Sequence, residues 1–374
     1  MYDCLYPYTI GGAERWYRNL AERLASSGHE VTFLTRRQWT RGEEPAVPGV
    51  RVLAVSPRME LYADGRRRIV PPVLFGLGVL RHLLRHGDDY DVVHTASFPY
   101  FSLLAAGVGR NRGRFRLLVD WLEVWTRDYW REYLGPVRGR IGWQIQRACL
   151  RTPQQAICFS RLHERRLRDE GFTGELTRLE GMYAGSTENT QRAAEPVVVF
   201  AGRHIPEKRV ASVVPAIAEA RKQVPELRGA IYGDGPERPK VLRAIADSGL
   251  EGVISAPGFV AASELEHALA TALCLVLPSR REGYGLVIIE AAAHGVPTVA
   301  VAGPDNAAVE LVEEGTNGAI ADSDSPQDLG AAILRIHDGG VTLRDAAAAW
   351  FRANAQRLSF ESSYQILLEV YGRT

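Results

Sequence analysis

The sequence lacks an apolar run of membrane length and has few cysteines, and both absences exclude classes of protein. Its longest apolar run, residues 69–80, has 12 residues and contains two prolines, whereas a membrane-spanning helix needs about 20. The opening residues, MYDCLYPYTIGGAE, have neither the basic nor the long apolar region that directs secretion. The four cysteines are widely spaced and form no CxxC pair. We therefore expect a cytoplasmic protein with reduced, mostly buried thiols and no metal site or disulfide framework.

Charge is divided unevenly along the chain. The 374 residues are 46% hydrophobic and 24% charged, as in an ordinary globular protein, and this length predicts two domains. Residues 1–178 carry 28 Arg and no Lys against 19 Asp and Glu, a net charge of +9, whereas residues 179–374 have a net charge of −8. Opposite charges fit two domains with different partners. Arginine-rich codon usage is the alternative explanation.

Short β-branched segments alternate with helical patterns along nearly the whole chain. Helical patterns occur, for example, at residues 13–27 and 290–294. Strands that are apolar throughout are covered on both faces, and strand–helix alternation produces parallel sheets with right-handed crossovers. We therefore predict an α/β protein built from doubly wound parallel sheets. The predicted strands are residues 31–35, 50–55, 91–94, 116–120, 156–160, 197–201, 230–233, 253–255, 273–278, 298–301 and 319–321.

The alternation breaks once, at about residues 180–195, where the sequence is small, polar and without apolar periodicity. We predict one domain over residues 1–180, a linker over 181–195 and a second domain over 196–355, followed by a helix at 356–374 that packs back toward the first domain. Two such domains facing one another would bind ligands at the carboxyl ends of their strands. The first helix begins about ten residues into the chain, so either the opening strand is unusually short or about five residues precede it.

The first half contains two weaker candidates for a site. Gly11 and Gly12, with Glu14, open the first helix, and exposed amides at a helix start attract an anion such as phosphate. A plain turn explains the same residues. His94 closes a predicted strand, where the alternative to a catalytic role is a structural one.

A basic loop follows the predicted strand at 197–201 in the second half. It contains Gly202, Arg203 and Lys208. Two fixed cations at a strand end suit a diphosphate, because Arg offers a planar fork and Lys a point charge. The alternative is a solvated basic loop.

A second loop of this half carries paired carboxylates. Glu282 follows the predicted strand at 273–278, and Glu290 lies about one turn inside the helix opened by Gly285. Charged carboxylates accept hydrogen bonds from the paired hydroxyls of a ribose or a hexose, and the free amides of residues 284–286 can hold a phosphate. The alternative is that Glu290 is an ordinary surface residue.

These residues fall into the motifs of a known family. Residues 282–290 form a Glu-x7-Glu motif, and residues 202–208 form a Gly-Arg-x4-Lys element. A Gly-Gly-x-Glu loop at 11–14 and a Gly-x-Asn-Gly turn at 315–318 occur in the expected order. In these motifs, and over almost the whole chain, the sequence resembles the retaining family-four glycosyltransferases. The resemblance implies the GT-B fold: two Rossmann-like domains, with the donor nucleotide mainly on the C-terminal domain and the acceptor on the N-terminal domain.

The resemblance also implies a role for each motif residue. Arg203 and Lys208 would grip the donor diphosphate and stabilise the departing nucleotide diphosphate. Glu282 would accept hydrogen bonds from the transferred sugar, and Glu290 from the ribose. It implies no metal and no other cofactor. The predicted catalytic residues are Arg203, Lys208, Glu282 and His94. The predicted donor-binding residues are Gly11, Gly12, Gly202, Gly283, Tyr284, Gly285, Leu286 and Glu290.

The N-terminal half departs from the family pattern at one strand end. Relatives usually place a histidine where this sequence has Leu122, so either a neighbouring carboxylate takes its role or transfer is impaired. Residues 121–135 contain three Trp and two Tyr beside charged residues, a composition that suits a sugar ring but also a helix core. The predicted acceptor-side residues are Asp120, Trp121, Glu123 and Trp125.

The motifs predict a glycosyltransferase that moves a hexose-type sugar from a nucleotide-diphosphate sugar to an acceptor hydroxyl, with retention at the anomeric carbon and without a metal. The alternative is a nucleotide-sugar-binding GT-B protein with weak or no transfer activity. A GT-B epimerase or phosphorylase is disfavoured, because an epimerase does not need the Glu-x7-Glu motif and the lysines show no signature for pyridoxal phosphate.

The expected partners are a nucleotide sugar donor and a small-molecule, glycan or lipid-linked acceptor. Nucleic-acid binding is not expected, because the basic residues are scattered. Arg66, Arg67 and Arg68 precede the apolar run at 69–80, and a basic–apolar segment of this kind can rest on anionic lipid. The alternative is a solvated loop that leads into a buried helix. The expected location is the cytoplasm, with peripheral contact at the inner membrane face.

Overall fold

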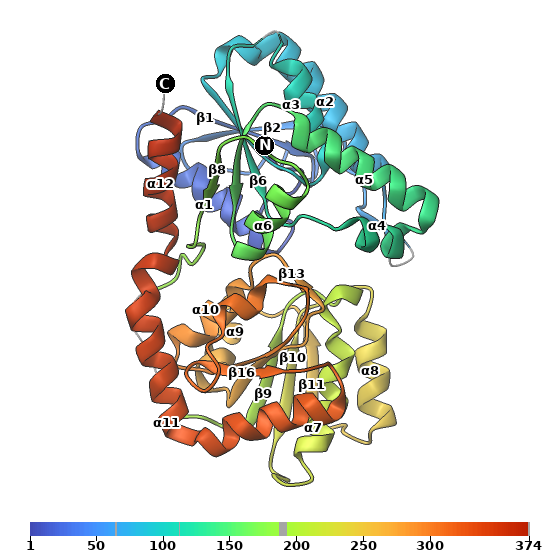
Figure 1. Cartoon of the computed structure of the whole chain (residues 1–374), viewed down its shortest axis with the longest axis vertical. Helices are drawn as coiled ribbons and strands as arrows, with labels where there is room; N and C mark the ends of the chain where they lie inside the picture. Colours follow the sequence, from blue (N-terminus) through green and yellow to red (C-terminus); the bar gives the residue numbers. More distant parts are fainter. Residues whose placement is uncertain (64–65, 112, 187–192, 373–374) are drawn as a thin grey trace. The chain divides into compact units, whose positions relative to one another are not determined.

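The chain divides into two compact units (Figure 1). Unit 1 comprises Met1–Leu179 and Tyr364–Thr374, and unit 2 comprises Glu180–Ser363. The described part of the predicted linker at 181–195 belongs to unit 2, while residues 187–192 of it lie outside the described residues. The predicted C-terminal helix at 356–374 is divided between the units. The computed structural model describes residues 1–63, 66–111, 113–186 and 193–372.

Unit 1 is built on parallel strands. β5, β6, β7 and β8 form one sheet in that order, and β1 pairs with β2. The first residues connect these two parts: the Tyr2 N–H donates to the carbonyl oxygen of Leu34 in β1 (3.1 Å), and the Met1 amino group donates to that of His94 in β5 (2.6 Å). The opening segment thus takes the place of a strand without forming one. The strands of unit 1 are β1 (Val31–Arg36), β2 (Val50–Ser56), β3 (Tyr62–Ala63), β4 (Arg66–Arg67), β5 (Val92–Ala96), β6 (Arg116–Trp121), β7 (Gln155–Cys158) and β8 (Leu176–Arg178).

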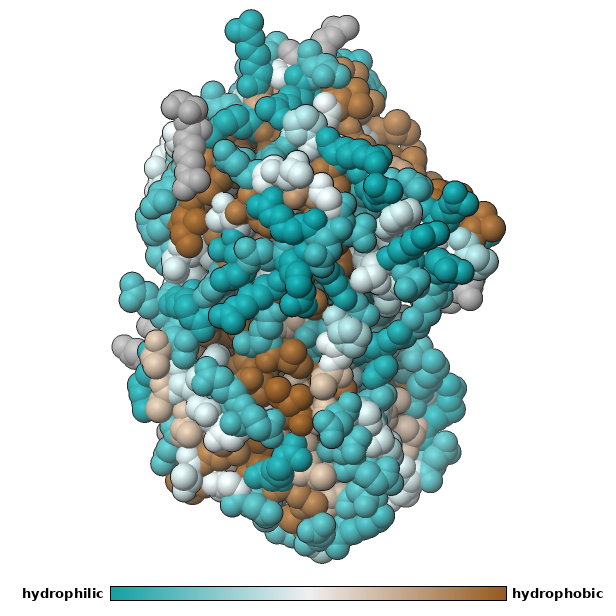
Figure 2. Space-filling model, viewed as in Figure 1, coloured by the Kyte–Doolittle hydropathy of each residue, from teal (hydrophilic) through white to brown (hydrophobic). Residues whose placement is uncertain are grey.

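Helices α2, α3 and α5 of unit 1 lie side by side (Figure 1). Their inner faces bury Phe75, Val79, Leu103 and Cys149 in one core with the strands. Their outer surface is apolar in part (Figure 2). The helices of unit 1 are α1 (Gly12–Ser26), α2 (Val70–His86), η1 (Gly87–Asp89), α3 (Tyr100–Gly109), α4 (Arg127–Leu134), α5 (Pro136–Arg151) and α6 (Arg161–Asp169).

Unit 2 contains a six-stranded parallel sheet in the order β11-β10-β9-β12-β14-β16. The central strands β9, β12 and β14 are apolar and almost wholly buried, as expected of strands covered on both faces. The doubly wound α/β fold is therefore confirmed. The strands are β9 (Val197–Ala201), β10 (Arg228–Tyr232), β11 (Ile254–Gly258), β12 (Cys274–Leu277), β13 (Arg281–Glu282), β14 (Thr298–Val301), β15 (Asp305–Asn306) and β16 (Gly318–Ala321). The helices are η2 (Pro206–Lys208), η3 (Val210–Ser212), α7 (Val213–Ala220), α8 (Arg238–Asp247), α9 (Ala262–Thr271), α10 (Leu286–Ala293), η4 (Ala307–Leu311) and α11 (Pro326–Leu358).

The last helix, α12 (Phe360–Gly372), leads from unit 2 into unit 1. Within unit 1 the Tyr364 hydroxyl donates to Oγ of Ser27 (2.8 Å). The Arg116 guanidinium donates to the carbonyl oxygens of Val370 and Tyr371, where a cation complements the negative end of a helix. Among the helices that the structure describes, none has both the length and the apolarity needed to cross a bilayer.

Candidate functional site

The loops that leave the carboxyl edge of the unit 2 sheet carry most of the predicted site residues. Gly202, Arg203 and Lys208 follow β9, Glu282 follows β12, and Glu290 lies on α10. In open α/β sheets, ligands bind at this edge, because the strand ends and helix starts that meet there present unpaired backbone groups. We call these loops and the start of α10 the strand-end site.

The backbone on both sides of Arg203 is fixed by the neighbouring loop after β10. The Gly202 N–H donates to the last carbonyl oxygen of β10 (3.2 Å), and the His204 N–H donates to that of Asp234 (2.8 Å). Gly233 has a φ of 111°, and a Cβ there would overlap the carbonyl oxygen of Gly202. Only glycine permits this close approach. The position of Arg203 therefore depends on Gly233, a residue that the sequence analysis did not single out.

Lys208 and Glu282 form an ion pair. Their side chains are 19% and 9% exposed, so both charges are largely withdrawn from water. Ser279 Oγ donates a hydrogen bond to the same carboxylate oxygen, Oε1 of Glu282 (2.8 Å). The fold thus brings together a cation and a carboxylate that come from different sequence motifs.

Two buried polar residues that the sequence analysis missed, Ser279 and Asn306, hold Glu282 in place. Asn306 Nδ2 donates to the carbonyl oxygens of Ser279 (3.0 Å) and Val301 (2.9 Å). Its Oδ1 accepts from the Ala308 N–H (3.1 Å) at the start of η4. The two-residue strand β13, which contains Glu282, pairs in parallel with β15. The sequence offered one signal for these residues: Ser279 is a polar residue directly after the apolar strand predicted at 273–278.

The start of α10 is set by Gly285, which has a φ of 97°. A Cβ at this position would lie 2.6 Å from the Cβ of Ala308, so glycine is required for packing as well as for backbone conformation. Glu290 is half-buried on the same helix. Burial, followed by the negative charge of Glu290, raises the pKa of Tyr183 to about 12, so the two side chains interact. The start of α10 supplies the positive end of a helix dipole at the strand-end site.

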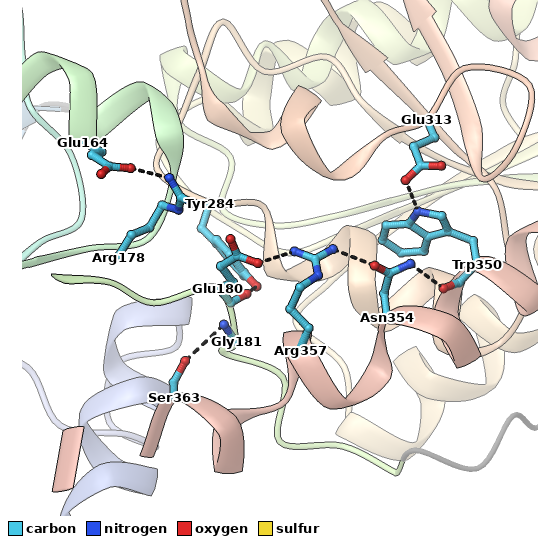
Figure 3. A network of polar contacts seen from close by, with 10 residues as sticks. All are labelled: Glu164, Arg178, Glu180, Gly181, Tyr284, Glu313, Trp350, Asn354, Arg357 and Ser363. Carbon is cyan, nitrogen blue, oxygen red and sulfur yellow. Dashed lines mark hydrogen bonds and ion pairs between the residues drawn. The ribbon is translucent and has the colours of Figure 1, made fainter. Parts of the chain in front are cut away.

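The side chain of Tyr284 reaches the segment where the chain enters unit 2 (Figure 3). Its hydroxyl donates to the carbonyl oxygen of Glu180, and burial raises its pKa. The Glu180 carboxylate accepts from Arg357 (2.6 Å), which also donates to Oδ1 of Asn354 (2.7 Å). The hydroxyl of Tyr284 is thus engaged in a structural bond. The donor contacts predicted for this turn would therefore involve its backbone amides, and they stay predictions.

The same network joins the entering and leaving segments of unit 2. The Gly181 N–H donates to Oγ of Ser363 (3.1 Å), and Trp350 Nε1 donates to Oε1 of Glu313 (2.7 Å). Figure 3 also shows the ion pair between Arg178 and Glu164, which lies in unit 1.

The Gly-x-Asn-Gly turn at 315–318 is held by its own asparagine. Asn317 is buried, accepts from the Glu313 N–H (2.7 Å) and donates to the carbonyl oxygen of Leu311 (2.8 Å). A Cβ at Gly318 would overlap the carbonyl oxygen of Thr298. This motif therefore has a structural role in unit 2.

The predicted glycine loop of unit 1 opens α1. Gly11 is extended, and the carboxylate of Glu14 folds back over it, so that a Cβ at Gly11 would overlap Oε2 of Glu14. A Cβ at Gly12 would meet nothing within 4 Å. Gly12 therefore leaves open space beside the first amides of the helix, where a ligand can approach the backbone.

His94 lies in a buried network of unit 1. Its Nε2 is 2.8 Å from Oδ1 of Asp120, and its Nδ1 is 2.7 Å from the hydroxyl of Tyr371 in α12. Trp16 Nε1 donates to the other Asp120 oxygen (2.8 Å). Asp120 and Trp121 are both 0% exposed, and their role on the acceptor side stays a prediction. Asp120 serves this network and Trp121 the core, while the catalytic role of His94 stays a prediction.

Glu123 and Trp125 lie nearer the surface. Trp125 Nε1 donates to Oε2 of Glu123 (3.0 Å), and both side chains are half-buried. The Trp125 ring contacts Phe98, Tyr129 and Tyr133, with ring centroids 6.3, 4.8 and 5.1 Å away. Phe98 and Tyr133 are exposed. These rings form an accessible aromatic surface beside a carboxylate, the arrangement predicted for the acceptor side.

The cysteines and the other potential metal ligands of the described residues do not cluster. The four cysteine thiols are buried, as predicted. Within the described ranges, no group of three His, Cys, Asp or Glu side chains is placed to hold a metal ion.

Comparisons with known proteins cover most of the chain. Residues 11–179 match the family described as "Glycosyl transferase 4-like domain", and residues 195–338 match "Glycosyl transferases group 1". A D-inositol 3-phosphate glycosyltransferase of Nocardioides sp. is 33% identical over 192 residues, which are 47% of this chain and 41% of that protein. The chain thus spans about two-fifths of the length of this relative.

Solved structures resemble the whole chain in fold. A sucrose-phosphate synthase from Thermosynechococcus elongatus covers 99% of this chain and 94% of its own, with a TM-score of 0.80 and 21% identity. HepE of Anabaena, solved with UDP and glucose, covers 100% and 99%, with a TM-score of 0.77 and 18% identity. These similarities confirm the predicted GT-B fold.

Proposed function

The chain belongs to the glycosyl transferases of group 1, and from this premise we propose that it moves a hexose-type sugar from a nucleotide-diphosphate sugar to an acceptor hydroxyl. We further propose that the reaction retains the anomeric configuration and needs no metal. The observation that carries the proposal is the ion pair of Lys208 and Glu282 beside the fixed loop of Arg203, at the edge of the sheet where ligands bind.

The cations of the strand-end site suit the leaving group of such a reaction. A nucleotide diphosphate gains negative charge as its bond to the sugar breaks, and fixed positive groups stabilise that charge without having to reorganise. Three features of the site supply positive charge: the side chains of Arg203 and Lys208, and the amino end of α10. This is the charge that a metal ion provides in other transferases, and it supports a metal-independent reaction.

The carboxylates suit the hydroxyl groups at the two ends of the donor. Glu282 lies against Lys208 and would accept from the transferred sugar, and Glu290 would accept from the ribose. The solved HepE structure contains UDP and glucose, so a uridine nucleotide is the first donor to test. We prefer transfer to donor binding alone, because the curated relative is named as a glycosyltransferase.

We propose that unit 1 binds the acceptor, a small molecule, glycan or lipid-linked glycan, near Glu123 and Trp125. Aromatic faces flanked by charge stack on sugar rings. The relative named above acts on D-inositol 3-phosphate by its name, which makes a phosphorylated polyol a reasonable first acceptor. We propose a cytoplasmic location and no nucleic-acid partner.

The test is a thermal-shift and calorimetry screen of UDP, GDP, ADP and dTDP and their sugars, followed by a product assay. A bound donor stabilises the folded state, by about 2.7 kcal/mol at 100 times its dissociation constant. Lys208→Ala should weaken binding about 10- to 100-fold, the worth of a charge-assisted hydrogen bond, and Glu290→Ala should also weaken it. Lys240→Ala is the matched control, since Lys240 is an exposed lysine of the same unit. Equal donor affinity in all four proteins would contradict the proposal.

A further inference from the structure

Three neighbouring helices of unit 1 carry no negative charge. Within their bounds, α2, α3 and α5 contain not one Asp or Glu. Exposed arginines occur on α2 and α5, namely Arg81, Arg85, Arg138, Arg140 and Arg151. By contrast, α1 and α6 of the same unit each carry acidic residues. These three helices therefore carry a net charge of +6, from Arg81, Arg85, Arg138, Arg140, Arg147 and Arg151.

The same helices expose large apolar side chains. On α2, Val70, Leu77 and Leu84 are 50%, 57% and 43% exposed, and their spacing of seven residues places them on one stripe of the helix. On α5, Val137 and Ile141 are 72% and 56% exposed. Half of the exposed large hydrophobic residues in the described chain lie on α2, α3 and α5 or at the start of α2. Such a concentration marks an interaction surface, whereas single exposed residues do not.

These side chains belong to a continuous surface. α2 packs on α3, and α3 packs on α5. Leu104 of α3 and Ile141 of α5 line a shallow groove of about 380 Å³, with Arg140 at its rim. Figure 2 shows apolar residues gathered over this part of unit 1, with hydrophilic residues among them. We call the outward side of these three helices the α2–α3–α5 face.

We propose that the α2–α3–α5 face docks on a bilayer surface that contains anionic phospholipid. Moving leucine, isoleucine and valine side chains from water to the acyl boundary of a bilayer lowers the free energy. Arginine side chains next to them can reach the phosphate groups. The acidic residues nearest in sequence lie outside the face, at Asp88 and Asp89 after α2 and at Asp128 and Glu132 on α4. Charge complementarity thus favours a negatively charged, laterally extended partner.

A second copy of the chain fits this face less well. A two-fold contact of the face with itself would bring the arginines of one copy against those of the other, with no carboxylate on these helices to pair them. The proposal is also independent of the donor chemistry, because none of its residues belongs to the strand-end site, which lies in unit 2.

Co-sedimentation of the full chain with sucrose-loaded vesicles tests the proposal. We expect binding to phosphatidylcholine vesicles with about 30% phosphatidylglycerol, at least about 10-fold stronger than to phosphatidylcholine alone, and weakened between about 0.05 M and about 0.5 M salt. Leu77→Glu with Ile141→Glu should reduce binding at least about 10-fold. Arg85→Gln with Arg140→Gln should reduce it about 25-fold, since each basic residue contributes about 5-fold.

The control is Leu242→Glu, which changes another exposed leucine (43%), on α8 of unit 2, and should leave vesicle binding unchanged. Donor binding should stay the same in every variant, which also shows that the proteins are folded. Absence of wild-type binding to anionic vesicles would overturn the proposal, as would equal binding by the face variants and the control. So would a wild-type dimer in light scattering that the face variants dissociate, because a second copy would then cover the face.

Discussion

Lys208 and Glu282 are 74 residues apart in the sequence and form an ion pair at the carboxyl edge of the unit 2 sheet. Removing either partner would leave the other charge unpaired in a largely buried position, which is costly. Under the proposed function, we expect a donor diphosphate to compete with Glu282 for the same ammonium group. The released carboxylate would then accept hydrogen bonds from the sugar, so donor binding would exchange one charged pair for another.

Glu282→Gln should separate donor binding from transfer. The amide leaves Lys208 without its competing carboxylate, so affinity for a free nucleoside diphosphate should be equal to or higher than that of the wild type. Transfer should fall at least about 100-fold, the usual cost of removing one electrostatic contact to the reacting group. Calorimetry with the diphosphate and a product assay measure the two effects. Lys208→Met is the matched variant at the other residue of the ion pair and should lose both diphosphate binding and transfer. If Glu282→Gln also lost diphosphate binding, the proposed exchange of ion pairs would be refuted.

Gly233→Ala should disturb the site through the backbone alone. The new Cβ would overlap the carbonyl oxygen of Gly202, and the backbone must also hold a φ of 111°. We expect a loss of more than about 2 kcal/mol in stability and weaker donor binding, because the loop of Arg203 must move. Gly252→Ala is the control: it has a φ of 82° but meets nothing within 4 Å, so it should cost about 1–2 kcal/mol and leave donor affinity unchanged. Thermal unfolding and calorimetry check both, and equal donor affinity in the two variants would contradict the role of Gly233.

Local patterns predicted most of the longer strands of both units, because a continuous run of β-branched apolar residues fits few structures other than a buried strand. The strands at Val197–Ala201 and Thr298–Val301 have the predicted bounds. The two-residue strands β13 and β15 were not predictable in this way. Arg281 pairs with Asp305, and both are polar, so their pairing depends on where the two loops meet and leaves no local pattern.

The sequence predicted individual site residues where a motif specified their chemistry. It did not predict which side chains the fold brings into contact with them. Lys208 and Glu282 were found as separate residues, and the structure places them in contact. His94 was predicted to close its strand, but β5 continues to Ala96, and the partner of His94, Tyr371, is 277 residues away in the last helix. A contact of that sequence separation cannot be read from spacing. The buried environment of Asp120 follows from the same long-range packing.

Tyr284→Phe should loosen the connection between the strand-end site and the point where the chain enters unit 2. The ring keeps its packing, but the carbonyl oxygen of Glu180 loses its donor. Loss of one buried hydrogen bond should cost about 1–2 kcal/mol. Amide hydrogen exchange should become faster at residues 180–183 and in α10. Tyr364→Phe is the control, since its hydroxyl donates to Oγ of Ser27 in unit 1 instead (2.8 Å), and it should leave α10 unaffected. Unchanged exchange in Tyr284→Phe would show that the ring alone holds the turn.

His204 should make the protein sensitive to acid. It is 0% exposed in the loop of Arg203, and burial is the main cause that lowers its pKa from the ordinary value of 6.5. The folded state therefore keeps the ring neutral, while the unfolded chain takes up a proton as the pH falls below about 6.5. Because the unfolded state binds more protons, stability rises with pH in this range and falls on acidification. His204→Leu should remove this part of the slope between about pH 6.5 and pH 5, measured as the melting temperature against pH. His29→Leu, at an exposed histidine of unit 1, should keep the wild-type slope, and an unchanged slope in His204→Leu would exclude His204 as its source.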